Sequence, residues 1–83
     1  MAEDLIHQGA RLLARWLALE VALSNEEQIQ KGLQEGNLPA RLGVVVLEAY
    51  GRYRESLPED VVSTTDYFKE ALNGIVGGGR KVF

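Results

Sequence analysis

The side chains that could do chemistry are few in this chain of 83 residues. His7 is the only histidine, and Asp4 lies one helical turn before it. A metal site needs three or four ligands, which this pair cannot supply alone. The chain has no cysteine, and none of Ser24, Ser56 and Ser63 lies in a nucleophile-elbow motif. The residue types therefore predict a solvated surface histidine, no bound metal and no enzyme.

Glu20 and two tyrosines are the remaining candidates for a reactive site. Glu20 falls within the apolar side of the first expected helix, and a buried carboxylate can act as a catalytic acid. A structural ion pair is the commoner use of such a carboxylate, and Arg52 or Arg54 can supply the cation. Tyr50 and Tyr53 are expected in the core with their hydroxyl groups at its rim. None of these residues predicts a catalytic site.

The glycine-rich run at 77–81 is followed by a hydrophobic end, Val82 and Phe83. It lacks the spacing and the strand–helix context of a phosphate-binding loop. No dinucleotide fingerprint or EF-hand pattern occurs, so no cofactor is expected. We predict a single helical domain over 1–76 and a flexible glycine-rich tail over 77–83. A tethered docking peptide is the alternative interpretation of the tail.

Length and composition indicate one small globular domain. Hydrophobic residues make up 46% of the chain and charged residues 25%. The formal net charge of -3 argues against attraction of the whole molecule to nucleic acid or anionic lipid. The longest apolar stretch, 12–23, is interrupted by Arg15 and Glu20 and is too short to span a bilayer. With no cysteine to oxidise, a cytoplasmic, soluble protein without a transmembrane segment is the expectation.

Hydrophobic periodicity predicts four helical segments and no strand. They run over about 3–23, 24–35, 39–56 and 63–76, with a single turn possible after Pro58. Leucine and alanine, which favour helices, dominate the first segment. The predicted fold class is therefore all-α: a small bundle of three to four helices that self-association completes.

Several residues are of types that commonly occur at helix ends. Ser24 and Glu27 have the spacing of a capping box, which predicts that a second helix starts at Ser24. Pro39 suits the first turn of the third helix, because its missing N–H has no acceptor there. Ser63 and Thr64 are candidate caps for the fourth helix.

The first and third segments are apolar around more than half of their circumference, about twice what a surface helix needs. One seam of the first helix consists of Leu5, Leu12, Trp16, Leu19 and Leu23. A second seam consists of Ile6, Ala10, Leu13, Leu17 and Val21, while Ala14 and Ala18 fall on the polar side. Val44 and Leu47 widen the apolar arc of the third helix. Gly43 and Gly51 flank Leu47, which a close crossing by another helix would explain.

So short a chain has few helices with which to cover two such faces, and surplus apolar surface usually marks an interface. We expect a non-enzymatic protein-interaction module, an adaptor, regulator or assembly subunit, that acts as a homo-oligomer. Its partners would be copies of itself, in a dimer or a tetramer, and another protein. A compact monomeric bundle is the alternative. The expected interface residues are Leu5, Leu12, Trp16, Leu19, Leu23, Leu13, Leu17, Val44 and Leu47.

A helix-turn-helix regulator that binds nucleic acid is the alternative function. The segments 24–35 and 39–56 have suitable lengths, and a glycine-containing turn joins them. Arg41, Arg52 and Arg54 would be the nucleic-acid contacts. The apolar residues at 42–46, where base contacts are needed, argue against it. Binding of the first helix to a membrane surface is a third and weaker possibility.

Overall fold

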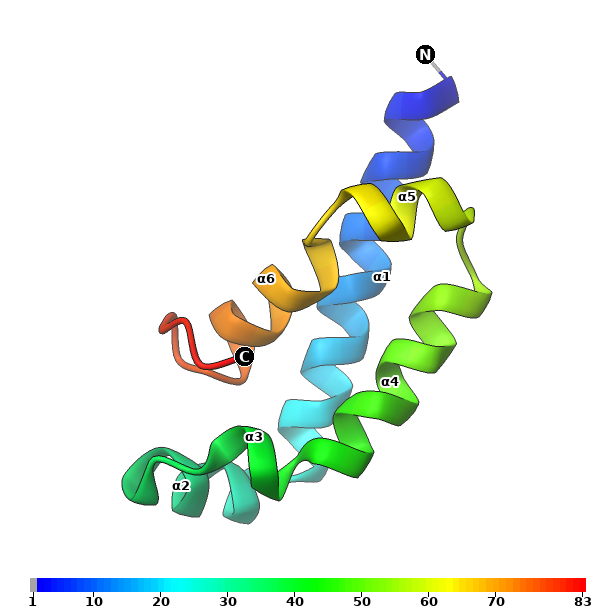
Figure 1. Cartoon of the computed structure of the whole chain (residues 1–83). Helices are drawn as coiled ribbons and strands as arrows, with labels where there is room; N and C mark the ends of the chain where they lie inside the picture. The colour runs from blue at the N-terminus through cyan, green and yellow to red at the C-terminus, as the bar shows by residue number, and fades with distance from the viewer. Residues whose placement is uncertain (1) are drawn as a thin grey trace.

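The computed structural model describes the backbone of residues 2–83 and the side chains from Asp4 onward. The described chain consists of α-helices joined by short connections, and it contains no strand (Figure 1). The helices are α1 (Ala2–Ser24), α2 (Glu26–Glu35), α3 (Leu38–Arg41), α4 (Gly43–Glu55), α5 (Glu59–Thr64) and α6 (Tyr67–Ile75). The predicted all-α class is confirmed, with six helices in place of three to four. None of the described helices has the length and apolar character needed to cross a membrane.

α1, with 23 residues, is the longest of the described helices. It extends along the length of a body that measures 43 × 21 × 20 Å. Figure 1 shows α6 crossing α1 on one side and α4 running beside it, and both helices contact α1. α2 packs against the short α3, which leads into α4.

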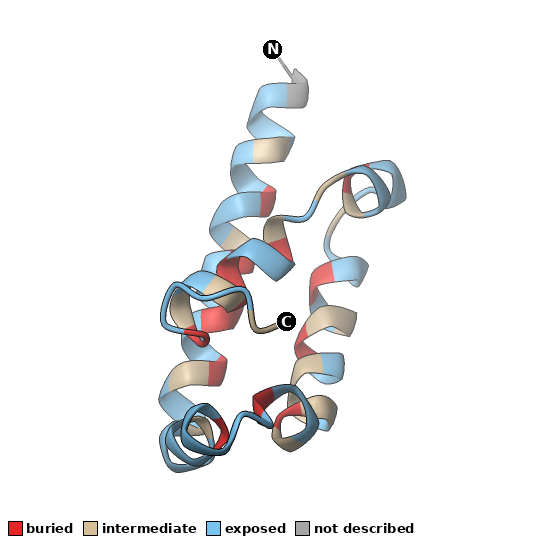
Figure 2. Ribbon diagram, turned by 60° about the vertical axis from the view of Figure 1, so that its left-hand side comes forward, coloured by how far each residue is buried: buried red, intermediate tan, exposed pale blue. Residues whose placement is uncertain are grey.

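The core lies between α1, α4 and α6, on the faces that these helices turn toward one another (Figure 2). The part of it that α1 contributes is Ala10, Ala14, Leu17, Ala18 and Val21. Ala14 and Ala18 have no exposed surface and share the core with Ala71 and Leu72 of α6. Their predicted place on a polar side is therefore wrong. Small side chains let two helix backbones approach closely, so α6 covers alanine residues that the wheel grouped with arginines.

A group of aromatic rings fills the space between α4 and α6. The Tyr53 and Phe68 rings stack with centroids 5.3 Å apart, and the Tyr50 ring lies 5.4 Å from Phe68. Tyr53 and Phe68 are buried, whereas Tyr50 is half-buried at the edge. Offset stacking of this kind stabilises a core beyond the area that it buries.

The junction of α1 and α2 differs from the expected capping box. Ser24 is the last residue of α1, and Asn25 alone separates the two helices. The Asn25 side-chain amide donates to the Val21 carbonyl oxygen at 2.9 Å. It thus satisfies a carbonyl group that the end of α1 leaves without a partner. The capping-box prediction for Ser24 and Glu27 is wrong, because α1 continues one residue too far for it.

The third predicted helix is divided at Leu42 into α3 and α4. Leu42 has φ -101° and ψ 10°, outside helical geometry, and its side chain is buried. Leu38 and Leu42 are four residues apart, so both lie on the side of this segment that faces the core. Hydrogen bonds of helical spacing still join Leu42 N–H to the Leu38 carbonyl oxygen at 3.1 Å and Val46 N–H to the Leu42 carbonyl oxygen at 2.8 Å.

α5 includes the two residues that were expected to cap the last helix. The Thr64 hydroxyl donates to the Asp60 carbonyl oxygen at 2.6 Å, and the Ser63 hydroxyl does so at 3.3 Å. Asp66 precedes α6 instead. The capping prediction for Ser63 and Thr64 is wrong, because both hydroxyl groups bond backward within their own helix.

The glycine run ends α6 as predicted and turns the chain back on it. Gly78 and Gly79 have φ of 67° and 88°, in the left-handed region that favours glycine. The N–H groups of Val82 and Phe83 then donate to Asn73 Oδ1 at 2.8 and 2.7 Å. Both residues are half-buried against the core, so the end of the chain lies on α6.

Candidate interaction surface

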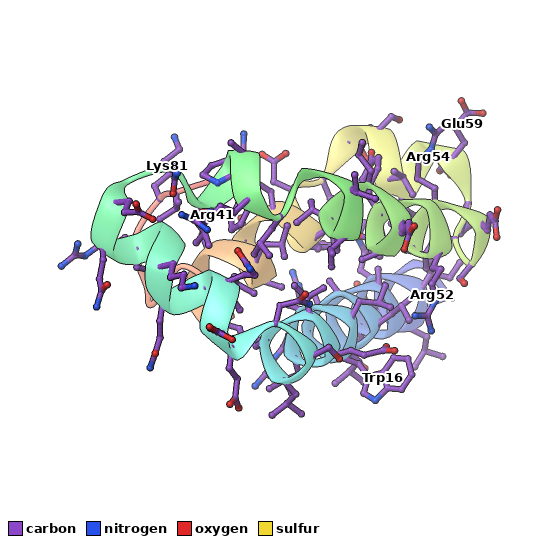
Figure 3. All side chains as sticks on the ribbon, turned by 90° about the horizontal axis from the view of Figure 1, so that it is seen from below. Trp16, Arg41, Arg52, Arg54, Glu59 and Lys81 are labelled. Atoms are coloured by element: carbon purple, nitrogen blue, oxygen red, sulfur yellow. The ribbon has the colours of Figure 1, made fainter. Side chains whose placement is uncertain are left out.

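α1 has small residues on its buried side and bulky residues on its outer side. Five large apolar side chains on the outer side are between 47% and 71% exposed. They form what we call the α1 stripe: Leu5, Leu12, Trp16, Leu19 and Leu23. Figure 3 shows the Trp16 ring pointing outward from α1, away from the other helices. α1 therefore contributes alanines, Leu17 and Val21 to the core and leaves four leucines and Trp16 exposed.

The spacing of the α1 stripe is that of a coiled-coil seam. With Gly9 included, its positions advance by alternating steps of four and three residues over the whole helix. Such a seam faces a single neighbouring helix, because a 3.5-residue period stays on one line of the helix surface. Burying a leucine side chain fully is worth about 1.5–3 kcal/mol. The seam is thus an extended apolar surface that the described fold leaves exposed.

The remaining predicted interface residues of α1 belong to the core. Leu17 is 1% exposed and is covered by the chain's own helices. Leu13 is half-buried and packs against the same cluster. Because Leu17 is buried within the chain, it cannot contribute to an interaction surface. Sequence reasoning placed Leu12 and Leu17 in different seams, but it could not say which of them the chain itself covers.

Val44 and Leu47 are exposed on α4, about 70% in each case. They lie apart from the α1 stripe on the other long helix of the domain. A Cβ atom added at Gly43 or Gly51 would have no described neighbour within 4 Å. No described helix of this chain therefore crosses α4 closely at these glycines. The described part of the chain does not contain the close crossing that would explain these glycines.

Leu47 also borders a groove of about 500 Å³ between α4, α5 and α6. The groove is lined mainly by apolar and aromatic groups, including Tyr50, Phe68 and Phe83. The Tyr53 hydroxyl is buried next to it and makes no hydrogen bond. Burial raises the pKa of this hydroxyl, and the neighbouring Thr65 opposes the rise only in part. A tyrosine with a raised pKa stays neutral at physiological pH, so Tyr53 is unsuited to act as a base.

An ion pair lies at the edge of the α1 stripe. Arg52 of α4 approaches Glu20 at 3.3 Å, and its guanidinium lies 5.9 Å from the centre of the Trp16 ring. Figure 3 shows Arg52 and Trp16 on the same side of the molecule. The predicted pairing of Glu20 with Arg52 is confirmed, but both side chains are exposed and not buried. An exposed pair contributes about 0–1 kcal/mol, so it adds little to the stability of the fold.

His7 connects α1 to α6. Its Nδ1 atom lies 2.8 Å from the Tyr67 hydroxyl, and the two rings meet edge to face. Arg11 lies 4.8 Å above the Tyr67 ring. His7 is half-buried in this contact, so the expectation of a freely solvated histidine is wrong. Among the described residues no group of three or more histidine, aspartate and glutamate side chains could hold a metal ion.

The three arginines of the nucleic-acid alternative do not form one patch. Arg41 bonds to Asn37, Gln28 and Glu35, at the opposite end of the molecule from the other two (Figure 3). Arg52 is paired with Glu20, and Arg54 lies 6.0 Å from the Tyr50 ring. Carboxylates neutralise two of the three cations, and phosphate binding needs free positive charge.

The chain has no match among protein-family models, curated proteins or solved structures. Its own surface must therefore indicate what it does. Within the described residues, the α1 stripe is the longest row of exposed large apolar side chains.

Proposed function

We propose that this protein is a non-enzymatic interaction module that acts as a small helical homo-oligomer through the α1 stripe. The observation that supports this most directly is the distribution of side chains on α1. Its buried face is built from alanines, Leu17 and Val21, while four leucines and Trp16 face water. Folding of a single chain does not use these large side chains, and an apolar patch of this kind usually marks an interface.

A second copy is the simplest partner for such a stripe. In a two-fold dimer the same surface serves both molecules, so one seam is enough to satisfy both. Covering the stripe on both copies would bury on the order of 1,000 Å² in total, near the lower limit for a specific interface. Val44 and Leu47 would remain available to another protein or to a second pair of copies. This fits an adaptor, a regulator or an assembly subunit, and the lack of cysteine fits work in the cytoplasm.

Light scattering after size-exclusion chromatography, over a series of concentrations, tests self-association. The wild-type chain should show two or four times the chain mass of 9.2 kDa. Leu12→Asp and Leu19→Asp should each give the monomer mass with the helical circular dichroism retained, because each places a charge in an apolar contact. Loss of contact at the centre of the stripe should weaken association by about 2 kcal/mol or more.

Leu33→Asp is the matched control. Leu33 is an exposed leucine on α2, outside the α1 stripe, so this variant should keep the wild-type mass. If either aspartate variant of the stripe unfolds, Leu12→Gln or Leu19→Gln makes the same test with a neutral side chain. A wild-type monomer at every concentration, or folded stripe variants that keep the wild-type mass, would refute the proposal.

A further inference from the structure

We infer that two copies of the chain pair through α1 in an antiparallel arrangement, with Leu5 of one copy facing Leu23 of the other. This inference rests on the proposed self-association and adds the orientation and register of the pair. The two-fold axis would pass the outer face of α1 at the level of residue 14. Three features support it: the order of the spacings, the sizes of the side chains and the position of Gly9.

The positions of the seam read the same in both directions along α1. Leu5, Gly9, Leu12, Trp16, Leu19 and Leu23 are separated by four, three, four, three and four residues. A reversed second helix can therefore place every position opposite another position of the same seam. Leu5 then faces Leu23, Gly9 faces Leu19, and Leu12 faces Trp16. In antiparallel coiled coils, layers formed from the two kinds of seam position arise in this way.

Side-chain size favours this orientation over a parallel one. In a parallel pair, Gly9 would face Gly9 and Trp16 would face Trp16. The first layer would leave a cavity, and the second would be overpacked, both of which are destabilising. The antiparallel pair instead sets the smallest residue against a leucine and the largest against a leucine. Large and small side chains that alternate across an interface interdigitate best.

The fold of the single chain does not require a glycine at position 9 for space. A Cβ atom added there would meet nothing within 4 Å, and glycine inside a helix is destabilising relative to alanine. In the antiparallel pair it leaves room for Leu19 of the second copy beside the bulky Leu12 and Trp16 layer. The opposed directions of the two helices also bring the positive end of each helix dipole near the negative end of the other.

The flanks of the seam are compatible with the pair. Glu20 and Arg52 are already joined beside Trp16, so their charges remain at the solvent-exposed rim. Arg15 is the least favourable residue, because it flanks the two-fold axis and would approach its own copy. Its side chain is exposed and long, so the guanidinium groups can extend into water while the stems cover the seam.

Disulfide trapping tests the orientation, because the natural chain has no cysteine to interfere. The full-length variants Leu5→Cys and Leu23→Cys are oxidised separately and as an equal mixture, with one of them carrying a mass tag. In the antiparallel pair, positions 5 and 23 of different copies lie within disulfide reach. The two copies of position 5 lie about 27 Å apart at a rise of about 1.5 Å per residue. Neither variant should thus cross-link alone. The mixture should give a cross-linked dimer, and that dimer should contain one tagged and one untagged chain.

A second pair and a control complete the experiment. Gly9→Cys mixed with Leu19→Cys should cross-link in the same way, so the test does not depend on the ends of the helix. Leu33→Cys, at an exposed leucine outside the stripe, measures cross-linking by random collision. Circular dichroism checks that each variant is folded. The four cysteines on α1, at positions 5, 9, 19 and 23, all replace exposed residues.

The possible results separate the orientation from the proposed function. If each single variant cross-links to itself, the pair is parallel, and self-association stands while the antiparallel inference is overturned. If light scattering shows an oligomer but no pair cross-links above the Leu33→Cys control, the copies meet through another surface, and the inference is again overturned. A monomeric wild-type chain overturns both. Cross-linking that is confined to the two mixtures supports the antiparallel pair.

Discussion

Tyr53 shows how a single buried atom can set a pH dependence. Its ring lies in the aromatic group with Phe68, and its hydroxyl has no hydrogen-bond partner. The neighbouring Thr65 hydroxyl donates to the Val61 carbonyl oxygen at 2.6 Å instead. Burial raises the pKa of the Tyr53 hydroxyl, so the folded state holds this proton more tightly than the unfolded chain. Ionisation of Tyr53 therefore leaves the free energy of unfolding unchanged below the pKa of the unfolded chain, which is about 10. Above that pH the free energy of unfolding falls, because the unfolded chain loses the proton more easily than the folded state.

Tyr53→Phe should remove that alkaline loss. At pH 7 the variant should be as stable as the wild type, or more stable by about 1 kcal/mol, because an unsatisfied buried hydroxyl is lost. Urea unfolding at neutral and alkaline pH measures both effects. Tyr50→Phe, in the same aromatic group but half-buried, is the control and should keep the wild-type alkaline loss. A Tyr53→Phe variant that is less stable at pH 7 would show that the hydroxyl has a partner in solution.

Gly32 is the residue on which the packing of α2 against α3 depends. A Cβ atom there would lie 2.7 Å from Leu38 Cδ1 and 2.8 Å from Leu38 Cα. The second contact is with backbone, which cannot move aside as a side-chain end can. Gly32→Ala should lower the free energy of unfolding by about 1–3 kcal/mol.

The same urea unfolding experiment has a matched control in Gly74→Ala. Gly74 is an exposed residue of α6, and a Cβ atom there meets nothing within 4 Å. This variant should be neutral or more stable by up to about 1 kcal/mol, because alanine favours the helix. Equal effects of the two substitutions would mean that α2 and α3 are not in tight contact.

At the scale of the elements, Asn73 joins the end of the chain to α6. Its Oδ1 atom accepts from the Val82 and Phe83 N–H groups. Asn73→Ala removes both hydrogen bonds, each worth about 1 kcal/mol, and should release the segment after Gly79. Trypsin should then cut after Arg80 and Lys81 roughly tenfold faster or more than in the wild type. Asn73→Asp keeps an acceptor oxygen and should cut near the wild-type rate.

Several helix ends differ from those that the local sequence patterns predict. The helix that periodicity predicts from Pro39 begins one residue earlier, at Leu38, and is divided at Leu42. The expected caps at Ser24 and Ser63 are instead inside α1 and α5. A cap depends on where a helix ends, and that position follows from which side chains the neighbouring helices bury.

At the scale of the whole molecule, self-association ties stability to concentration. If the α1 stripe is buried only in the oligomer, the midpoint of thermal unfolding should rise as the wild-type concentration rises. The reason is that only folded chains associate, so association favours the folded state. Leu19→Asp should give a midpoint that does not change with concentration. Differential scanning calorimetry over a hundredfold concentration range measures this. A constant wild-type midpoint would agree with a monomer and contradict the proposal.

The sequence by itself determined the helical class, the approximate extent of the long helices and the wide apolar arc of α1. Hydrophobic spacing is a local property, and residues three and four apart share a face in any helix. The end of α6 at the glycine run was equally local, since left-handed backbone favours glycine. Arg52 and Arg54 were both candidates for a pair with Glu20, and the structure selects Arg52.

Only the tertiary structure decided which seam is inside. Leu17 and Leu12 are both leucines of α1, yet Leu17 is 1% exposed and Leu12 66%. Hydrophobicity does not separate them. The close approach of α6 to Ala14 and Ala18 does, because only small side chains allow two backbones to meet there. That choice leaves the larger side chains of α1 in water, and it depends on contacts between residues more than fifty positions apart in the chain.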